Sequence, residues 1–421
     1  MMLQILNNRK KEIFFFILLL IIFYRSPHIL LYGRFVVEEG SLFFANAYKY
    51  GFVYSFFFVE FKAGYFNIWA NLSGIIANIF TLKLAPLVSN YLSLIPKLLI
   101  FYFILYKDLY LTDKFHYKIV LCLLILLSPL NVPEIWLNSL NSQIFFCILS
   151  FLVLFSKNDK KNINHFNLLI ILIAGFTGVY TCVLTPVFLF KYLKFKTSQD
   201  KYNLIILIFC TIIQFILVVF SKLSNVLYEG KLHAVDINLI YNYVYNVPIK
   251  AFLGRNLTQF FFNSLNFNIK SVFIFFCILG LFILTYLIYY FKKNPNIFNS
   301  NKFIINSLFY AFISTSLLTL TGAVYEYVGG RYAALPSFYL VTLVLFLAII
   351  INELNLKIFF HLILLISILS GAYEFKNNNK YKKYIICINC PNWSSEVEKF
   401  NKNSNYNIKI WPYPRRTMKL N

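Results

Sequence analysis

The chain has 421 residues, of which 59% are hydrophobic and only 13% are charged. Soluble globular proteins carry about 25% charged residues, so this composition excludes an ordinary soluble domain. The net charge of +23 comes mainly from lysines in short segments between apolar runs, without a nucleic-acid-binding motif. It therefore indicates positively charged cytoplasmic loops and anionic lipid headgroups rather than a nucleic-acid partner.

Apolar runs of membrane-spanning length recur along nearly the whole chain, so we predict an all-α polytopic membrane protein. The run 167–192 contains Gly175, Gly178 and Pro186 and has lysines beyond both ends, which indicates two short spans that turn near residues 177–181. Together the runs predict about eleven transmembrane helices. The other spans are expected at residues 13–31, 86–106, 117–131, 142–156, 203–222, 270–291, 302–321, 332–351 and 356–371.

The positive-inside rule predicts a cytoplasmic N-terminus, because the basic residues 9–11 precede the first span. The same rule places a first external loop at 32–85 and a large external loop at 223–269. We therefore expect a transmembrane domain over residues 1–371 and a small extracytoplasmic C-terminal cap over residues 372–421.

Two stretches of these loops have different characters. Residues 65–82 cannot cross the bilayer if the topology is to close, so they are expected to form a helix that lies in the outer interface. The polar Asn71 and the small Gly74 suit that position. The large external loop shows no clear helix or strand pattern.

Three charged or reactive features have ordinary interpretations. Asp200 lies beside lysines in a cytoplasmic loop and is expected to be solvated. Lys97 lies within an apolar run, so it either faces the protein interior or snorkels outward. Cys387 and Cys390 form a CxxC without a second pair or nearby histidines, which disfavours zinc and leaves a local disulfide open.

Two adjacent carboxylates, Glu38 and Glu39, come directly after the first span and before Gly40. A carboxylate is costly to hold beside hydrocarbon, so near a bilayer it is more often kept for chemistry or ion handling. We interpret the pair as the acid/base centre of a membrane-embedded transferase. The alternative interpretation is a solvated pair in a loop.

External carboxylates and a few external cations lie near the ends of spans, where several loops can meet over one cavity. A carboxylate there can accept the proton of an acceptor hydroxyl, and a guanidinium can stabilise a leaving lipid phosphate. Arg331 follows Gly329 and Gly330 at an outer span end, which suits the second role. The alternative is that Arg331 is an interfacial snorkelling arginine. The pattern fits transfer of a sugar from a lipid phosphate to a hydroxyl group.

The chain also resembles bacterial membrane proteins of the GT-C glycosyltransferase superfamily. In these proteins an acidic pair and a glycine follow the first span, and an aromatic segment with Ala-Gly-Tyr comes next. The resemblance covers most of the chain through short motifs: Glu38-Glu39-Gly40-Ser41-Leu42-Phe43, Ala63-Gly64-Tyr65-Phe66-Asn67, Pro133-Glu134, Asn141-Ser142-Gln143, Gly330-Arg331-Tyr332, Leu335-Pro336 and Lys409-Ile410-Trp411-Pro412.

The resemblance implies a GT-C-like fold with interfacial helices in the first external loop, in the bacterial cytoplasmic (inner) membrane. It implies a polyprenyl-phosphate-linked sugar donor, a glycan or lipid acceptor of the cell envelope, and catalysis at the outer leaflet. Glu39 stands where these relatives usually have aspartate. We predict Glu39 as the general base with Glu38 second, and no required cofactor, although the pair could hold Mg²⁺ or Mn²⁺. The residues expected to bind substrate are Arg331, Arg34, Glu60, Lys62, Tyr65, Asn141, Gln143 and Tyr332.

Two other functions compete with this prediction. A transporter or flippase of a lipid-linked saccharide is expected to show internal repeats and charges near the bilayer midplane. The sequence shows no repeat, and its external acids lie near span ends, which favours the enzyme. An envelope polysaccharide polymerase or ligase is close in chemistry, but it is expected to concentrate arginines in one large loop, and 223–269 contains only Arg255.

Overall fold

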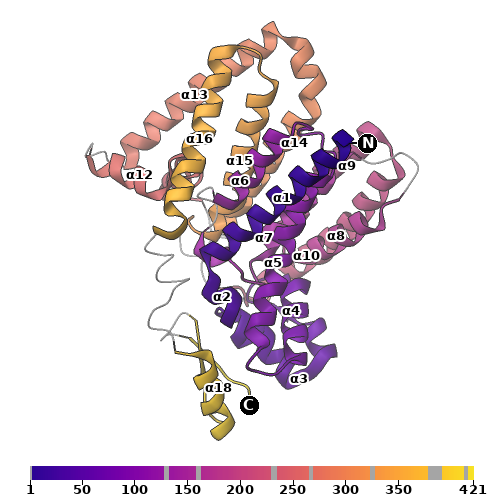
Figure 1. Cartoon of the computed structure of the whole chain (residues 1–421), viewed down its shortest axis with the longest axis vertical. Helices are drawn as coiled ribbons and strands as arrows, with labels where there is room; N and C mark the ends of the chain where they lie inside the picture. The colour runs from indigo at the N-terminus through magenta and orange to yellow at the C-terminus, as the bar shows by residue number, and fades with distance from the viewer. Residues whose placement is uncertain are drawn as a thin grey trace. The chain divides into compact units, whose positions relative to one another are not determined.

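The protein is described by a computed structural model that covers residues 2–127, 132–157, 163–228, 235–264, 269–322, 328–377, 391–411 and 416–421. The described chain is mainly helical (Figure 1). It divides into two compact units. The first unit comprises Met1–Lys107, Pro133–Leu227 and Lys376–Asn421, and the second comprises Asp108–Val132 and Tyr228–Phe375.

The first unit contains the N-terminal helices, the first loop and the C-terminal segment. Its elements are α1 (Met2–Arg25), α2 (Pro27–Tyr32), the π-helical turn η1 (Glu39–Phe44), α3 (Ala45–Phe56), β1 (Val59–Glu60), β2 (Tyr65–Phe66), α4 (Ile68–Ile79), α5 (Ala85–Tyr106), η2 (Pro133–Ile135), α7 (Ser142–Phe155), α8 (His165–Gly175), η3 (Cys182–Leu184), α9 (Thr185–Phe195), α10 (Ser198–Leu223), α18 (Trp393–Lys402), β3 (Ile408–Ile410) and β4 (Arg416–Met418).

The second unit consists of longer helices. Its elements are α6 (Phe115–Leu127), α11 (Ile237–Val244), the π-helical turn η4 (Tyr245–Ile249), α12 (Lys250–Ser264), α13 (Ile269–Lys293), α14 (Pro295–Gly322), α15 (Arg331–Ile350) and α16 (Leu354–Asn377). Three of these elements, α11, η4 and α12, lie in the large loop, where no clear helix pattern is visible in the sequence. This Tyr-rich loop therefore contains helices.

Within the described residues, six helices are long and apolar enough to cross a membrane: α5, α10, the Phe273–Lys293 part of α13, α14, α15 and the Leu354–Lys376 part of α16. This finding confirms the prediction of a helical multi-pass membrane protein. The expected number of about eleven spans stays a prediction. α1 is not among the six, because charged residues near both of its ends leave a short uncharged stretch between them.

The expected first span is not one continuous helix. α1 ends at Arg25, and α2 begins at Pro27. Ser26 between them is not helical, with φ −144° and ψ 59°, because a residue before proline is pushed away from the helical region. The break between α8 and α9 falls where glycines and a proline interrupt the apolar run, as the sequence predicts. The stretch 65–82 contains the twelve-residue helix α4, which is too short to cross a bilayer.

The C-terminal segment packs against the first loop in the same unit. The Trp393 ring meets the Phe35 ring edge-on at a centroid distance of 5.6 Å, and Val37 donates its backbone N–H to the carbonyl of Trp411 at 2.8 Å. The first loop and the C-terminal segment therefore form one packed unit. Their shared apolar core consists of Phe35, Phe44, Ala45, Ala77, Ala85, Phe400, Ile408, Ile410, Met418 and Leu420.

Gly33 allows the first loop to approach α5 closely. Its φ is +69°, and a Cβ atom there would lie 2.3 Å from the backbone nitrogen of Leu87. We expect Gly33→Ala to lower the free energy of unfolding by at least ~2 kcal/mol, through left-handed strain and overpacking. Thermal unfolding of the detergent-solubilised protein measures this change. Gly280→Ala is the control, because a Cβ at Gly280 meets nothing within 4 Å; equal effects of both variants would contradict the expectation.

Candidate functional site

The Glu39 carboxylate is buried at the start of the π-helical turn η1, with 2% of the residue exposed. Its Oε1 accepts hydrogen bonds from the Ser89 hydroxyl at 2.7 Å, and from the hydroxyl and backbone N–H of Ser139 at 2.7 and 2.9 Å. Its Oε2 accepts the backbone N–H of Val36 at 3.2 Å. Glu39 thereby joins three parts of the first unit: the first loop, α5 and the loop before α7.

Burial raises the pKa of Glu39, while the hydrogen bonds from Ser139, Ser89 and Val36 oppose that shift. A carboxyl group with a raised pKa holds its proton at a higher pH than an ordinary glutamate. A raised carboxyl pKa is common at acid/base sites, and the role of Glu39 as general base stays a prediction. The arrangement also gives Glu39 a structural task, because four protein donors depend on it.

Arg34 lies five residues before Glu39. Its backbone is held by Asn90, the residue that follows Ser89 in α5. Its backbone N–H donates to Asn90 Oδ1 at 2.9 Å, and Asn90 Nδ2 donates to the carbonyl of Arg34 at 3.2 Å. Asn90 Nδ2 also donates to the carbonyl of Leu137 at 3.0 Å. Adjacent residues of α5 thus fix both the carboxylate and the backbone of the arginine.

The backbone is strained on both sides of this network. Val37 has φ +45° and Leu137 has φ +48°, a region that bulky side chains rarely adopt. Such strain persists only where the surrounding structure enforces it, and it is concentrated at functional sites. Sequence reasoning missed Ser89, Asn90 and Ser139, although the polar Ser89 and Asn90 within the otherwise apolar span of α5 were a visible signal.

Glu38 differs from its neighbour, because it is only half-buried. It occupies the residue before η1 and caps that turn without a side-chain hydrogen bond. The adjacent carboxylates are therefore not equivalent. Glu39 is enclosed by protein, whereas solvent or a substrate can reach Glu38.

A second group of predicted residues lies around the short hairpin β1–β2. Glu60 pairs with Tyr65 across the hairpin, and its Oε1 accepts the backbone N–H of Lys62 at 3.2 Å. Gln143 Nε2 donates to the Tyr65 hydroxyl at 3.4 Å. Asn141 instead donates its Nδ2 to the carbonyl of Glu134 at 2.9 Å, which orders the loop before α7.

Arg331 and Tyr332 begin α15 in the second unit. Arg331 Nη2 donates to the Tyr332 hydroxyl at 3.2 Å, and the guanidinium carbon lies 5.1 Å from the centroid of the Tyr332 ring. Gly330, with φ +60°, precedes the helix. Because Glu39 belongs to the first unit, the expected meeting of Glu39 and Arg331 stays a prediction.

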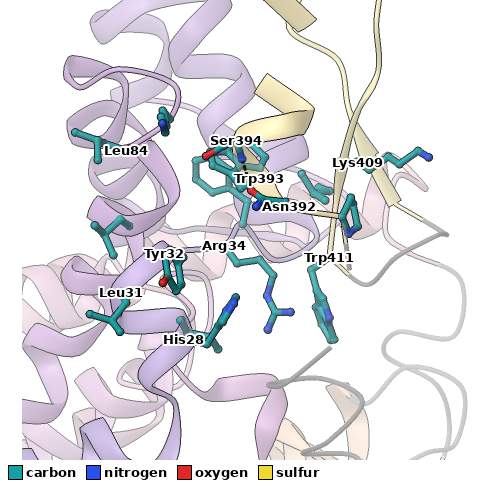
Figure 2. A pocket seen from close by; sticks show the side chains of 17 residues that line it. His28, Leu31, Tyr32, Arg34, Leu84, Asn392, Trp393, Ser394, Lys409 and Trp411 are labelled. Atoms are coloured by element: carbon teal, nitrogen blue, oxygen red, sulfur yellow. Dashed lines mark hydrogen bonds between the residues drawn. The ribbon is translucent and has the colours of Figure 1, made fainter. Parts of the chain in front are cut away.

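A cavity of about 660 Å³ lies in the first unit, between the α2 region, the start of α5 and the C-terminal segment. Its lining includes the basic residues His28, Arg34, Lys83 and Lys409, and among the described residues that line it there is no aspartate or glutamate. Figure 2 shows the Arg34 guanidinium between His28 and Trp411, while the Lys409 side chain points away. Of the residues predicted to bind substrate, only Arg34 lines this cavity.

Arg34 is the main charge in the cavity. Its guanidinium carbon lies 5.2 Å from the centroid of the Trp411 ring, a distance suited to a cation–π contact. Burial lowers the pKa of Arg34 to about 10, which leaves it protonated at neutral pH.

Lys97 faces the protein interior, one of the two positions expected for it. It is 3% exposed, and its Nζ lies 3.7 Å from the centroid of the Trp136 ring and 4.4 Å from that of Phe145. Arg25 contacts the same indole, at 4.1 Å from its ring centroid. Two cations therefore share one buried aromatic side chain.

Within the described residues, no three His, Cys, Asp or Glu side chains gather as metal ligands. Metal binding by Glu38 and Glu39 stays a prediction. Cys387 and Cys390 lie outside the described residues, so the disulfide does too. No protein-family model, no curated protein and no solved structure matches the chain.

Proposed function

We propose that the protein transfers a sugar from a polyprenyl-phosphate-linked donor to a glycan or lipid acceptor of the cell envelope. The observation that carries this proposal is that one candidate membrane helix, α5, fixes both a buried carboxylate and the backbone of a basic residue. Ser89 of α5 holds the Glu39 carboxylate, and Asn90 holds the backbone of Arg34. The strained residues Val37 and Leu137 support a functional role for the same loops.

The reaction needs a base for the acceptor hydroxyl. The acceptor oxygen forms a bond to the anomeric carbon, the bond from that carbon to the phosphate oxygen breaks, and the hydroxyl proton goes to a carboxylate. Glu38 is accessible, whereas the four hydrogen bonds of Glu39 come from the protein itself. The geometry therefore favours Glu38 as proton acceptor and Glu39 as the residue that positions the turn.

The leaving lipid phosphate needs a positive charge. Arg331 is the residue that the sequence favours for this role, and its bidentate guanidinium suits a phosphate. Its contact with Tyr332 fixes the side chain near the start of α15. The proposal places the reaction at the outer face of the bacterial cytoplasmic membrane, with a cytoplasmic N-terminus and an extracytoplasmic C-terminus.

The test uses the full-length protein in lipid nanodiscs with radiolabelled polyprenyl-phosphate hexoses and envelope glycan or lipid acceptors. We expect Glu38→Gln to slow release of polyprenyl phosphate at least ~100-fold, the usual scale for a lost general base. Its unfolding midpoint should not change, because Glu38 is half-buried without a side-chain capping bond. Glu398→Gln, an exposed change on α18, is the control. Unchanged turnover in Glu38→Gln would refute its role as base.

A transporter or flippase is the second candidate, and Lys97 is the observation that favours it. Lys97 lies in the middle of the candidate span α5, and charges near the midplane are typical of carriers. In the same nanodiscs, absence of transfer with every donor would reject the enzyme. Proteoliposomes that move a lipid-linked saccharide across the bilayer would then establish the carrier.

A further inference from the structure

The cavity between the first loop and the C-terminal segment lies beside the start of the candidate membrane span α5. Leu84 and Leu87, at the beginning of the candidate span α5, form part of its wall. Trp393 and Trp411 of the C-terminal segment form another part. Tryptophan is enriched at membrane–water interfaces, where its ring has both an apolar body and a polar N–H group.

The positive charge of the cavity favours an anionic ligand. Arg34 is protonated, partly buried and directed into the cavity (Figure 2). Lys83 lines the rim and is exposed, and none of the lining residues that the structure describes is acidic. The first turn of α5 adds the positive end of a helix dipole, which favours phosphate.

The exposed apolar side chains around the cavity favour a lipid as the ligand. Leu31, Tyr32 and Leu84 line it and are 55%, 63% and 46% exposed. Large apolar side chains with this exposure beside a candidate span face hydrocarbon or the interface. The anionic head of a lipid would thus contact the basic residues, and its apolar tail would contact the exposed apolar side chains.

The size of the cavity fits more than a bare phosphate. Small-molecule sites have volumes of about 300–1,000 Å³, and the value of about 660 Å³ falls within that range. A phosphate that carries a further polar group, such as a sugar, has room there.

We propose that this cavity binds the phosphate monoester head group of a membrane lipid, with Arg34 as its principal ligand and Lys83 at the rim. The choice of a polyprenyl phosphate as that lipid rests on the proposed function. The preference for a lipid-borne phosphate does not rest on the proposed function, because it follows from the charge and the surroundings of the cavity. The site lies entirely within the first unit and does not involve Arg331.

The experiment measures binding of polyprenyl monophosphate to the full-length protein in detergent by native mass spectrometry and by quenching of tryptophan fluorescence. Trp393 and Trp411 line the cavity, so a ligand there should change their emission. We expect Arg34→Gln to weaken binding about 10- to 100-fold, the scale of a charge-assisted hydrogen bond. Lys83→Gln should weaken it a few-fold. Lys83 is exposed, so that loss would not reflect misfolding.

Lys402→Gln is the matched control, because Lys402 is exposed at the end of α18 and does not line the cavity. Unaltered affinity in both Arg34→Gln and Lys83→Gln would overturn the proposal. Equal affinity for inorganic phosphate would show a free-phosphate site, and equal affinity for the uncharged polyprenol would show that phosphate is not recognised. Either result also refutes it. Arginine-dependent binding without any sugar transfer would keep this inference and reject the proposed function.

Discussion

Replacing Glu39 by leucine is expected to destabilise the protein by roughly 3–5 kcal/mol, because four donors lose a buried acceptor. Glu39→Gln should cost only about 1 kcal/mol. A glutamine oxygen can still accept from Ser89 and Ser139, whereas its amide nitrogen faces the N–H of Val36, which also donates. Thermal unfolding of the two variants in detergent measures both changes.

The same pair of variants separates a positioning role from a catalytic one. If Glu39 positions the turn, Glu39→Gln should retain transfer within about 10-fold of wild type, while Glu38→Gln loses it. A Glu39→Gln protein that is stable and has no transfer would make Glu39 the base, as the sequence suggested. Turnover of polyprenyl-phosphate sugar is the measurement.

The pH dependence of stability adds a third readout. Because burial raises the pKa of Glu39 in the folded state, ionising this group costs the folded protein free energy as pH rises through that pKa. The stability of wild type relative to Glu39→Gln should therefore decline as pH rises above the ordinary carboxyl range. A constant difference between the two proteins would contradict the raised pKa.

The second large effect is expected at a buried ion pair between α9 and α10. Lys191 Nζ lies 2.9 Å from Asp200 Oδ1, and both side chains are 3% exposed. The Thr197 hydroxyl donates to Asp200 Oδ2 at 2.6 Å. Removing one partner leaves the other charge buried, so Lys191→Met should lower the free energy of unfolding by about 3–5 kcal/mol.

The double variant Lys191→Met with Asp200→Leu is the control for this pair. Replacing both charges by apolar groups removes the uncompensated charge, so its stability should return to within about 1 kcal/mol of wild type. Thermal unfolding in detergent compares the single and double variants. Additive losses would show that the two residues do not act as a pair.

Asp200 shows where sequence reasoning fails. The residue stands beside lysines in the sequence and was expected to be solvated, yet it is buried against Lys191. The helical hairpin of α9 and α10 brings these two groups together, and local charge density does not reveal that. By contrast, the candidate spans were predictable, because an apolar run of about 20 residues has few alternatives to a helix in a bilayer.

The candidate site was predictable in part for a similar reason. Glu38, Glu39 and Arg34 stood out because charge beside an apolar span is costly. The partners that define their environment are neutral: Ser89 and Ser139 carry no charge signal. The cavity was not predictable at all, since Trp393 and His28 become neighbours only through the fold.

The position of the C-terminal segment has a consequence for biogenesis. One wall of the cavity is translated well before the other, so the intervening helices are synthesised before the cavity can close. Until then the apolar face of Phe35 and Phe44 has no cover from α18 and the β3–β4 hairpin. A ribosome-bound nascent chain should therefore expose this face, and a chaperone or the insertion machinery would have to shield it until the C-terminal segment has been translated.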